Sequence, residues 1–493
     1  MKPSALPEFL AQAARLLGDG AVKTAPSDLE PYCVDWRRRF FGKAAAILFP
    51  GSAELLAQTV QLANHYQIAL VPQGGNTGLS GGATPDASGE QVIVSLLRLN
   101  RVREQDAVNK TLTVEAGITL LKAQELADTM GLLFPLSLGA EGSATIGGNL
   151  ATNAGGTAVL RYGNARDLCL GLEVVTPAGD IWNGLRRLRK DNTGYDLRDL
   201  FIGSEGTLGF ITAAVLKLFP KPAGRLTALV RVASAADALA LLQIAQARCD
   251  AALTGFEYMS AQSVQVVVDH FPDVAKHGAQ IIGGSADAGL SDSVLIEISH
   301  PFSEDAAKDL LESVIAEAIE RATASDAIIA QSIAQTKALW HLRETITLAA
   351  AEDGVQVKLD IAVPVSRLAE FIDQMDQEML AEFPSIRLHN FGHFGDGNLH
   401  YNIGAPQSLA AGLSAEQRRA AYRAFIEQNE GTIRRKVHDR VVAFNGSISA
   451  EHGLGQLRKA EAWRIKSPVE RRLMKTIKQA LDPNGILNPG KVL

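Results

Sequence analysis

Histidines gather in one short stretch of this 493-residue chain, HNFGHFGDGNLHYNI, which runs from His389 to Ile403. Within it, Asp396-Gly397-Asn398 is typical of a tight turn between two extended arms. Such a hairpin would bring His393 and His400, one on each arm, close together. Paired imidazoles of this kind either hydrogen-bond at the surface or bind a metal, and these residues alone leave both interpretations open.

A carboxylate for the same site lies further along the chain, in SISAEHGLG, where Glu451 directly precedes His452. Structural and catalytic zinc sites need at least three protein ligands. Two imidazoles and one carboxylate with open coordination positions are typical of a catalytic site for Zn²⁺, with Mn²⁺ or Fe²⁺ as alternatives. His393, His400 and Glu451 are therefore candidate ligands of a divalent metal.

Three glycine-rich stretches suggest a second kind of site: VPQGGNTGLSGG (71–82), GAEGSATIGGNLATNAGG (139–156) and FIGSEGTLGFIT (201–212). Glycines leave the backbone bare, so that successive N–H groups can point at one anion. The glycine spacing fits neither the Rossmann fingerprint nor a Walker loop. A single loop of this kind is usually only a turn, but three of them favour a large phosphate-bearing cofactor.

In this order, QGGNTGLSGG, IGGNLATNAGG, RKDNTGYDL and IGSEGTLG resemble the FAD domain of the vanillyl-alcohol oxidase/PCMH flavoprotein family. The resemblance covers most of the chain and is greatest to the branch that oxidises D-2-hydroxyglutarate. It implies an α+β fold: a PCMH-type FAD-binding domain (1–224), a cap domain with the metal site (225–452) and a C-terminal segment that returns to the FAD domain (453–493). The cap is expected to be an antiparallel sheet covered by helices on one side, with the active site between the two domains.

The resemblance also implies roles for single residues. His393, His400 and Glu451 would be zinc ligands, His452 would be the catalytic base, and His389 falls outside the motif as a packed or exposed histidine. The pyrophosphate of FAD would lie on Gly74, Gly75, Asn76, Thr77 and Gly78, and the flavin on Gly148, Asn149, Asn153 and Gly155. Glu205, Gly206, Ile211 and, from the C-terminal segment, Asn488 would complete the cofactor site.

Two cations could bind the carboxylates of a substrate. Arg343 and Thr347 lie four residues apart on one face of a predicted helix, and Lys358 follows in the stretch VQVKLDIAV. A single cation is ordinarily a solvated surface charge, but the resemblance implies that these three residues, together with Asn402 and His452, bind the substrate. Two cations and a hydroxyl would suit a dicarboxylate better than lactate.

In some members of the family that the chain resembles, FAD is attached covalently through a histidine, sometimes with a cysteine as well. Here no histidine lies between His65 and His270, and Cys169 is the one cysteine in that span, so the resemblance implies non-covalent FAD. The resemblance implies oxidation of a D-2-hydroxy acid, first of all D-2-hydroxyglutarate to 2-oxoglutarate, with hydride transfer from C2 to flavin N5. A D-lactate or glycolate dehydrogenase of the same group is one alternative. A zinc hydrolase and a non-catalytic cofactor-binding protein are the others.

The elements that must position these residues alternate along the chain. Residues 52–66 have helical spacing, and 68–72, 92–96 and 111–117 are typical of strands. After 218–224, which is typical of a boundary, the expected order is strand 226–232, helix 236–247, strand 294–299, helix 303–320, a long helix over 333–351 and strand 355–363.

Composition limits the partners. The net charge of −6, with 46% hydrophobic and 21% charged residues, is ordinary for a globular protein and argues against nucleic acid or an anionic membrane. The three cysteines show no paired spacing, and no apolar run is long enough to cross a bilayer. We therefore expect a cytoplasmic protein that is not an integral membrane protein. Its expected partners are a small D-2-hydroxy acid and an unidentified electron acceptor, and the family suggests a homodimer.

Overall fold

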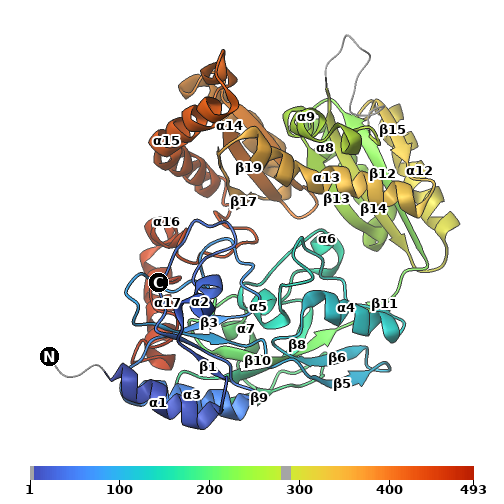
Figure 1. Cartoon of the computed structure of the whole chain (residues 1–493). Helices are drawn as coiled ribbons and strands as arrows, with labels where there is room; N and C mark the ends of the chain where they lie inside the picture. Colours follow the sequence, from blue (N-terminus) through green and yellow to red (C-terminus); the bar gives the residue numbers. More distant parts are fainter. Residues whose placement is uncertain (1–4, 279–289) are drawn as a thin grey trace. The chain divides into compact units, whose positions relative to one another are not determined.

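The computed structural model describes residues 5–278 and 290–493, and the chain divides into two compact units (Figure 1). Unit 1 combines Met1–Gly156, Tyr162–Lys221 and Glu451–Leu493. Unit 2 combines Thr157–Arg161 and Pro222–Ala450. Both units contain helices and sheets, as an α+β fold requires.

Unit 1 contains two main sheets. The smaller has the order β1 (Val22–Lys23), β2 (Ala46–Leu48), β4 (Val92–Ser95), β3 (Leu70–Gln73), and β2, β4 and β3 run parallel. The larger is antiparallel, in the order β5 (Val102–Asp106), β6 (Thr111–Glu115), β10 (Phe210–Lys217), β8 (Cys169–Val175), β9 (Ile181–Gly184). The short strands β7 (Leu132–Leu133) and β11 (Phe219–Pro220) pair separately. The strands predicted over 68–72, 92–96 and 111–117 are confirmed as β3, β4 and β6.

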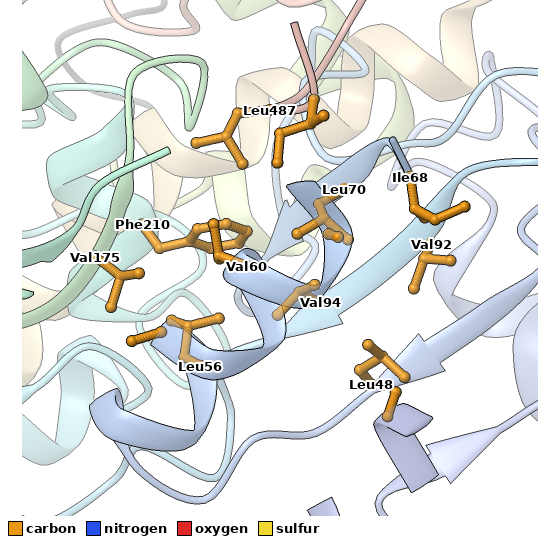
Figure 2. Packing of buried hydrophobic residues seen from close by; sticks show 14 of the residues in the cluster. Leu48, Leu56, Val60, Ile68, Leu70, Val92, Val94, Val175, Phe210 and Leu487 are labelled. Carbon is orange, nitrogen blue, oxygen red and sulfur yellow. The ribbon is translucent and has the colours of Figure 1, made fainter. Parts of the chain in front are cut away.

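Helix α3 (Ala53–Tyr66) packs its apolar face on both sheets of unit 1, which confirms the predicted helix. The helix begins after Ser52, whose hydroxyl accepts the N–H of Leu55, as an N-cap serine does. Figure 2 shows Leu56 and Val60 of this helix among side chains of the small sheet and beside Val175 and Phe210 of the large one. One core therefore supports both sheets, and the glycine-rich loops extend from it.

The C-terminal segment is part of this core. After α16 (Lys459–Ile465) and α17 (Pro468–Leu481), the chain runs parallel to β3, with Leu487 beside Leu70. Leu70 donates its N–H to the carbonyl of Ile486 and accepts the N–H of Asn488, both at 2.8 Å. Leu487 is fully buried in the cluster of Figure 2. The tail thus fixes the strand from which the first glycine-rich loop leaves.

Unit 2 is built on one eight-stranded sheet whose strand pairs are all antiparallel, as predicted for the cap. The order is β15 (Asp326–Ile329), β12 (Gly224–Val232), β14 (Asp292–His300), β13 (Leu253–Met259), β18 (Arg387–His393), β19 (Asn398–Gly404), β16 (Gln356–Val357), with β17 (Asp360–Ala362) also paired to β19. Its helices include α8 (Ala235–Cys249), α9 (Ala261–His270), α12 (Glu304–Glu320), α13 (Ile333–Asp353), α14 (Leu368–Glu382) and α15 (Ala415–Ala443).

Helices cover both faces of this sheet, so the expectation of helices on one side is wrong. Asn390 of β18 donates its amide to Asp376 of α14, whereas the next residue, Phe391, packs in a buried cluster with Leu342 of α13. Because consecutive residues of a strand point to opposite faces, α13 and α14 lie on opposite sides of the sheet. The buried run over 293–299 in β14 is the sequence signal for burial on two faces.

The strand predicted over 355–363 is also wrong in detail, because it is broken into β16 and β17 with Lys358 in the gap. The two pieces pair with different parts of β19.

Among the residues that the structure describes, none of the helices is both long and apolar enough to cross a membrane.

Candidate active site

The predicted hairpin is confirmed: β18 and β19 pair antiparallel, and Gly397 in their turn has a φ of +88°, which glycine adopts readily. Phe391 lies opposite His400 in this register. His393 stands two residues further along the same face of β18, so its ring and that of His400 are 5.8 Å apart between centroids. His389 also belongs to β18 and is fully buried.

Glu451 supplies a third ligand atom beside the two imidazoles. One ligand atom from each of His393, His400 and Glu451 lies within 4.8 Å of the others. The division between the units falls at the peptide bond between Ala450 and Glu451, and Ala450 donates its N–H to the carbonyl of Asp360 in unit 2. The backbone of unit 2 therefore leads Glu451 to the two histidines. This donor set, two neutral nitrogens and one carboxylate, fits a divalent metal such as Zn²⁺.

Each histidine of this trio has a second carboxylate behind its ring. Nδ1 of His393 lies 2.7 Å from Oε1 of Glu257, and Nδ1 of His400 lies 4.0 Å from Oδ1 of Asp360. Strand register explains both pairs, because Glu257 of β13 is opposite His393 and Asp360 of β17 is opposite His400. At His393 the carboxylate lies within hydrogen-bond distance of Nδ1 and leaves Nε2 as the ring nitrogen for a metal, which is the usual arrangement around metal-bound histidine. At 4.0 Å, Asp360 lies near His400 but beyond hydrogen-bond distance.

Glu257 also binds Arg343, the predicted substrate arginine on α13. The Nε and Nη2 atoms of Arg343 lie 3.1 and 2.9 Å from Oε2 of Glu257, and both side chains are buried. Burial raises the pKa of Glu257, but the electrostatic interactions and hydrogen bonds with His393 and Arg343 outweigh burial and bring the pKa to about 2. Arg343 is therefore not a solvated surface charge but half of a buried pair next to a predicted metal ligand.

The other predicted substrate residues differ in exposure. Thr347 is exposed on α13, four residues from Arg343. Lys358 is half-buried in the gap between β16 and β17, and Asn402 of β19 is buried and accepts the N–H of Leu359 at 3.3 Å. Asn402 and His400 are two residues apart in β19 and so share one face of the sheet.

Unit 1 contains an open cavity where the three glycine-rich loops meet. Ten of the predicted cofactor residues line it: Gly74, Gly75, Asn76, Thr77, Gly78, Gly148, Asn149, Glu205, Gly206 and Ile211. His452, the predicted base, also lines this cavity. Consecutive residues of the chain thus belong to two features, Glu451 to the ligand trio and His452 to the cavity wall.

The loops fit a large phosphate-bearing cofactor because glycines let their backbones approach closely. A Cβ atom at Gly74 would lie 2.3 Å from Oγ1 of Thr145, and one at Gly75 would lie 1.8 Å from the carbonyl oxygen of Ser143. Thr145 in turn caps the short helix α5 (Ile146–Ala151). In the described part of the chain the buried amide nitrogen of Asn149 has no hydrogen-bond partner, so a cavity-lining donor is ready for a cofactor oxygen.

Three predicted cofactor residues are not among those that line the cavity: Asn153, Gly155 and Asn488. Asn153 accepts the N–H of Arg166 at 3.0 Å, and the Asn488 amide donates to the carbonyls of Gly82 and Glu205 at 2.9 and 2.8 Å. The sequence did not single out several lining residues, among them Ser80, Thr145, Thr152, Ser204 and Phe210. For the serines and threonines, the small hydroxyl side chain near a glycine was the only signal, and Phe210 had none beyond its place in the third stretch.

Comparison with known proteins shows to which family a chain with this cavity and this ligand trio belongs. Residues 44–184 match the profile of an FAD binding domain, and residues 221–492 match that of the C-terminal domain of FAD linked oxidases. The second match alone spans more than half of the chain. The chain belongs to the FAD-linked oxidase family. Relatives of this FAD-linked oxidase are similar to it over almost its whole length.

The FAD-linked oxidase is 38% identical over 480 residues to the D-2-hydroxyglutarate dehydrogenase of Xanthomonas citri pv. viticola, which covers 96% of this chain and 94% of that protein. It is 34% identical to a putative mitochondrial D-lactate dehydrogenase of Schizosaccharomyces pombe, over 96% of this chain and 86% of that one. The crystal structure of p-cresol methylhydroxylase with substrate bound has a TM-score of 0.74 at 16% identity, covering 100% of this chain and 97% of that chain. This last likeness concerns the fold alone.

These matches confirm three predictions: the PCMH-type FAD-binding domain followed by an antiparallel cap, FAD as the cofactor, and an FAD-linked dehydrogenase or oxidase as the kind of enzyme. The zinc hydrolase and the non-catalytic binding protein do not agree with this family and are set aside. In the FAD-linked oxidase, the cavity of unit 1 is therefore the candidate flavin site.

In the FAD-linked oxidase, hydrogen bonds from two other parts of unit 1 hold the loop that contains His452. Ser80 donates its hydroxyl to the carbonyl of His452 at 3.0 Å, and Arg458 donates to the hydroxyl of Ser80 at 2.8 Å. On the other side, Glu205 accepts the N–H groups of Leu454 and Gly455. Burial raises the pKa of Glu205, and these two N–H groups oppose the rise. Glu205 was predicted to touch the cofactor, and the structure shows it bound to the loop of the predicted base.

Proposed function

We propose that this FAD-linked oxidase converts D-2-hydroxyglutarate to 2-oxoglutarate with the help of a divalent metal, zinc in the first place. One observation carries the proposal: Glu451 belongs to a trio of metal-type ligands, and the next residue, His452, lines the candidate flavin cavity. The name of the Xanthomonas relative supplies the substrate.

The chain's own groups would hold FAD without a covalent bond. The N–H groups of 74–78 and the amide of Asn149 line the cavity where the phosphates and the flavin need donors. When bound there, FAD supplies the acceptor for the hydride that leaves C2 of the substrate. An external electron acceptor must then take the two electrons in each cycle.

His393, His400 and Glu451 would hold the metal, with Glu257 and Asp360 behind the two histidines. A divalent ion in this position lowers the pKa of a hydroxyl bound to it, as it lowers that of water. The trio would supply three protein ligands to such an ion, and the hydroxyl and one carboxylate oxygen of a 2-hydroxy acid would take further positions.

His452 is the residue that we propose takes the hydroxyl proton. Imidazole titrates near neutral pH, which suits a general base. Its backbone carbonyl is fixed by Ser80, and the loop that follows is fixed by Glu205. His452 is thus held in the wall of the cavity that would bind the flavin, and it directly follows the proposed ligand Glu451 in the chain.

The substrate's carboxylates would be bound by Arg343, Lys358, Thr347 and Asn402. Arg343 already shares its charge with Glu257, and Lys358 would contribute a second cation for the second carboxylate. A charged hydrogen bond of this kind contributes roughly 1.5–3 kcal/mol. Because lactate has no second carboxylate to form such a bond, the bond would favour a dicarboxylate over lactate by about one to two orders of magnitude.

D-lactate is the second candidate substrate, because the Schizosaccharomyces pombe relative carries that name. Steady-state rates with a dye acceptor distinguish the two, using D-2-hydroxyglutarate, D-malate, D-lactate and glycolate at equal concentrations. We expect the highest kcat/KM for D-2-hydroxyglutarate. A higher value for D-lactate or glycolate would replace the proposed substrate and keep the reaction type.

A further inference from the structure

One buried carboxylate binds two predicted site residues at once. Oε1 of Glu257 faces Nδ1 of His393 at 2.7 Å, and Oε2 faces Arg343 at 2.9 Å. Glu257 has no exposed surface and lies on β13, whose register sets it opposite His393. Neither oxygen of Glu257 is exposed to solvent, and each contacts one side chain, Oε1 that of His393 and Oε2 that of Arg343.

The contact with His393 determines which ring nitrogen is available to a metal. A carboxylate accepts and cannot donate when ionised, so Nδ1 of His393 carries the proton that is donated to Glu257. Nε2 then keeps its lone pair and faces away from Glu257, on the side of the ring where a metal ligand must point. Without an acceptor at Nδ1, either tautomer and more than one ring rotation would be open to His393.

The contact with Arg343 fixes a guanidinium on α13. Two of its three nitrogens are engaged by Glu257, and its carbon lies 4.9 Å from the ring centroid of Phe391, which packs on the same face. Within the described residues, Nη1 is the nitrogen that these contacts leave for another oxygen. A charge held by a rigid partner loses little conformational entropy when it binds a carboxylate.

We propose that Glu257 is a positioning residue that orients His393 for the metal and Arg343 for the substrate through one carboxylate. The proposal rests on the proposed metal site and substrate, and it adds a residue that sequence motifs do not mark. Glu257 touches neither metal nor substrate itself. Its effect reaches the reaction through the two side chains that it holds.

The test compares Glu257→Gln with Glu297→Gln in the FAD-loaded protein. Glu297 is the matched control, because it is buried in the neighbouring strand β14 and bonds to α13 through Trp340 at 3.0 Å, but holds no imidazole. The readout is the Kd for Zn²⁺, measured by competition with a chromophoric chelator. Circular dichroism and thermal unfolding report whether unit 2 of each variant is folded, and flavin content reports the state of unit 1.

We expect Glu257→Gln to bind Zn²⁺ about 10–100-fold more weakly than the native protein, as loss of a carboxylate behind a metal-bound histidine does elsewhere. Glu297→Gln should keep the native Kd within about twofold. With Zn²⁺ saturating, Glu257→Gln should also raise KM for D-2-hydroxyglutarate, because Arg343 loses its support. A native Zn²⁺ affinity in flavin-loaded Glu257→Gln would overturn the proposal.

Glu257→Gln leaves Arg343 buried without a counter-charge, and this variant can fail to accumulate as folded protein. The double variant Glu257→Gln/Arg343→Gln removes both charges and tests the His393 contact alone, with the same expected loss of Zn²⁺ affinity. Failure of the native protein to bind Zn²⁺ would refute the metal site as well. Native binding that survives in both variants would refute only the role of Glu257.

Discussion

The carboxylate of Glu205 accepts the backbone N–H of Leu454 at 2.7 Å and that of Gly455 at 2.8 Å. These bonds join the third glycine-rich loop to the loop that begins with the predicted ligand Glu451 and base His452. Glu205 itself has a φ of +51°, which is uncommon for a residue with a side chain and fits a site under structural constraint. Through these bonds the unit with the candidate flavin cavity holds the loop of the proposed base His452 in place.

Replacing Glu205 by Gln should therefore loosen the loop of His452. A glutamine amide has one acceptor oxygen, so one of the two N–H groups loses its partner at a cost of about 1–3 kcal/mol. We expect a lower Tm. We also expect kcat to fall by a larger factor than KM rises, because the substitution disturbs the loop of the proposed base and leaves the proposed substrate-binding cations unchanged. Thermal unfolding and steady-state kinetics measure the two effects, and a variant with native values of both would contradict the role of Glu205.

Gly75→Ala should abolish FAD binding, since a Cβ atom there would lie 1.8 Å from the Ser143 carbonyl oxygen. The two loops would have to separate, and the cavity between them would lose its shape. Gly142→Ala is the matched control, because a Cβ atom at Gly142 has no neighbour within 4 Å. Flavin content after purification gives the answer. Native flavin content in Gly75→Ala would show that the close approach of these loops is not needed.

Much of this architecture follows from local patterns in the sequence. The helix at Ala53–Tyr66 and the hairpin around Gly397 have signals within a few residues, namely apolar spacing with a serine cap and a turn with glycine. Glu257 has no such signal, because it reaches His393 across 136 residues only when β13 and β18 pair. The break between β16 and β17 at Lys358 was not predicted for the same reason. It depends on how these two strands pair with different parts of β19, which lies about forty residues further along the chain.

Lys358→Met should reduce kcat/KM for D-2-hydroxyglutarate by about 10–100-fold and leave D-lactate nearly unaffected, since lactate has no second carboxylate. Lys337→Met is the control, because Lys337 is an exposed lysine of α13. The ratio of kcat/KM for the two substrates is the measurement. An equal loss for both substrates would assign Lys358 to the shared carboxylate or to the structure of unit 2.

The stability of unit 2 should depend on Asp376 in weakly acidic solution. Burial raises the pKa of Asp376 from 3.8 to about 6, although Tyr401 and Asn390 donate hydrogen bonds to it. Because the folded state binds this proton more tightly than the unfolded state, stability falls as pH rises from about 4 to about 6. Above this range the ionised group costs about 1–3 kcal/mol.

Asp376→Asn should remove this cost and raise Tm at neutral pH, with little change near pH 4, where Asp376 is protonated in the native protein. Its amide could donate to Asn390 Oδ1, which is buried without a partner among the described residues. Thermal unfolding across pH checks both expectations. An Asp376→Asn protein that is less stable than the native one at neutral pH would contradict the account of this carboxylate.

The central claim, that a metal held by His393, His400 and Glu451 assists oxidation by the flavin, is tested most directly by anaerobic flavin reduction. The FAD-loaded protein is mixed with D-2-hydroxyglutarate, before and after metal removal by a chelator and again after addition of Zn²⁺. Flavin absorbance should bleach in the native protein, bleach far more slowly without metal and recover its rate with Zn²⁺, while L-2-hydroxyglutarate has no effect. Equal bleaching by a demonstrably metal-free protein would contradict the claim.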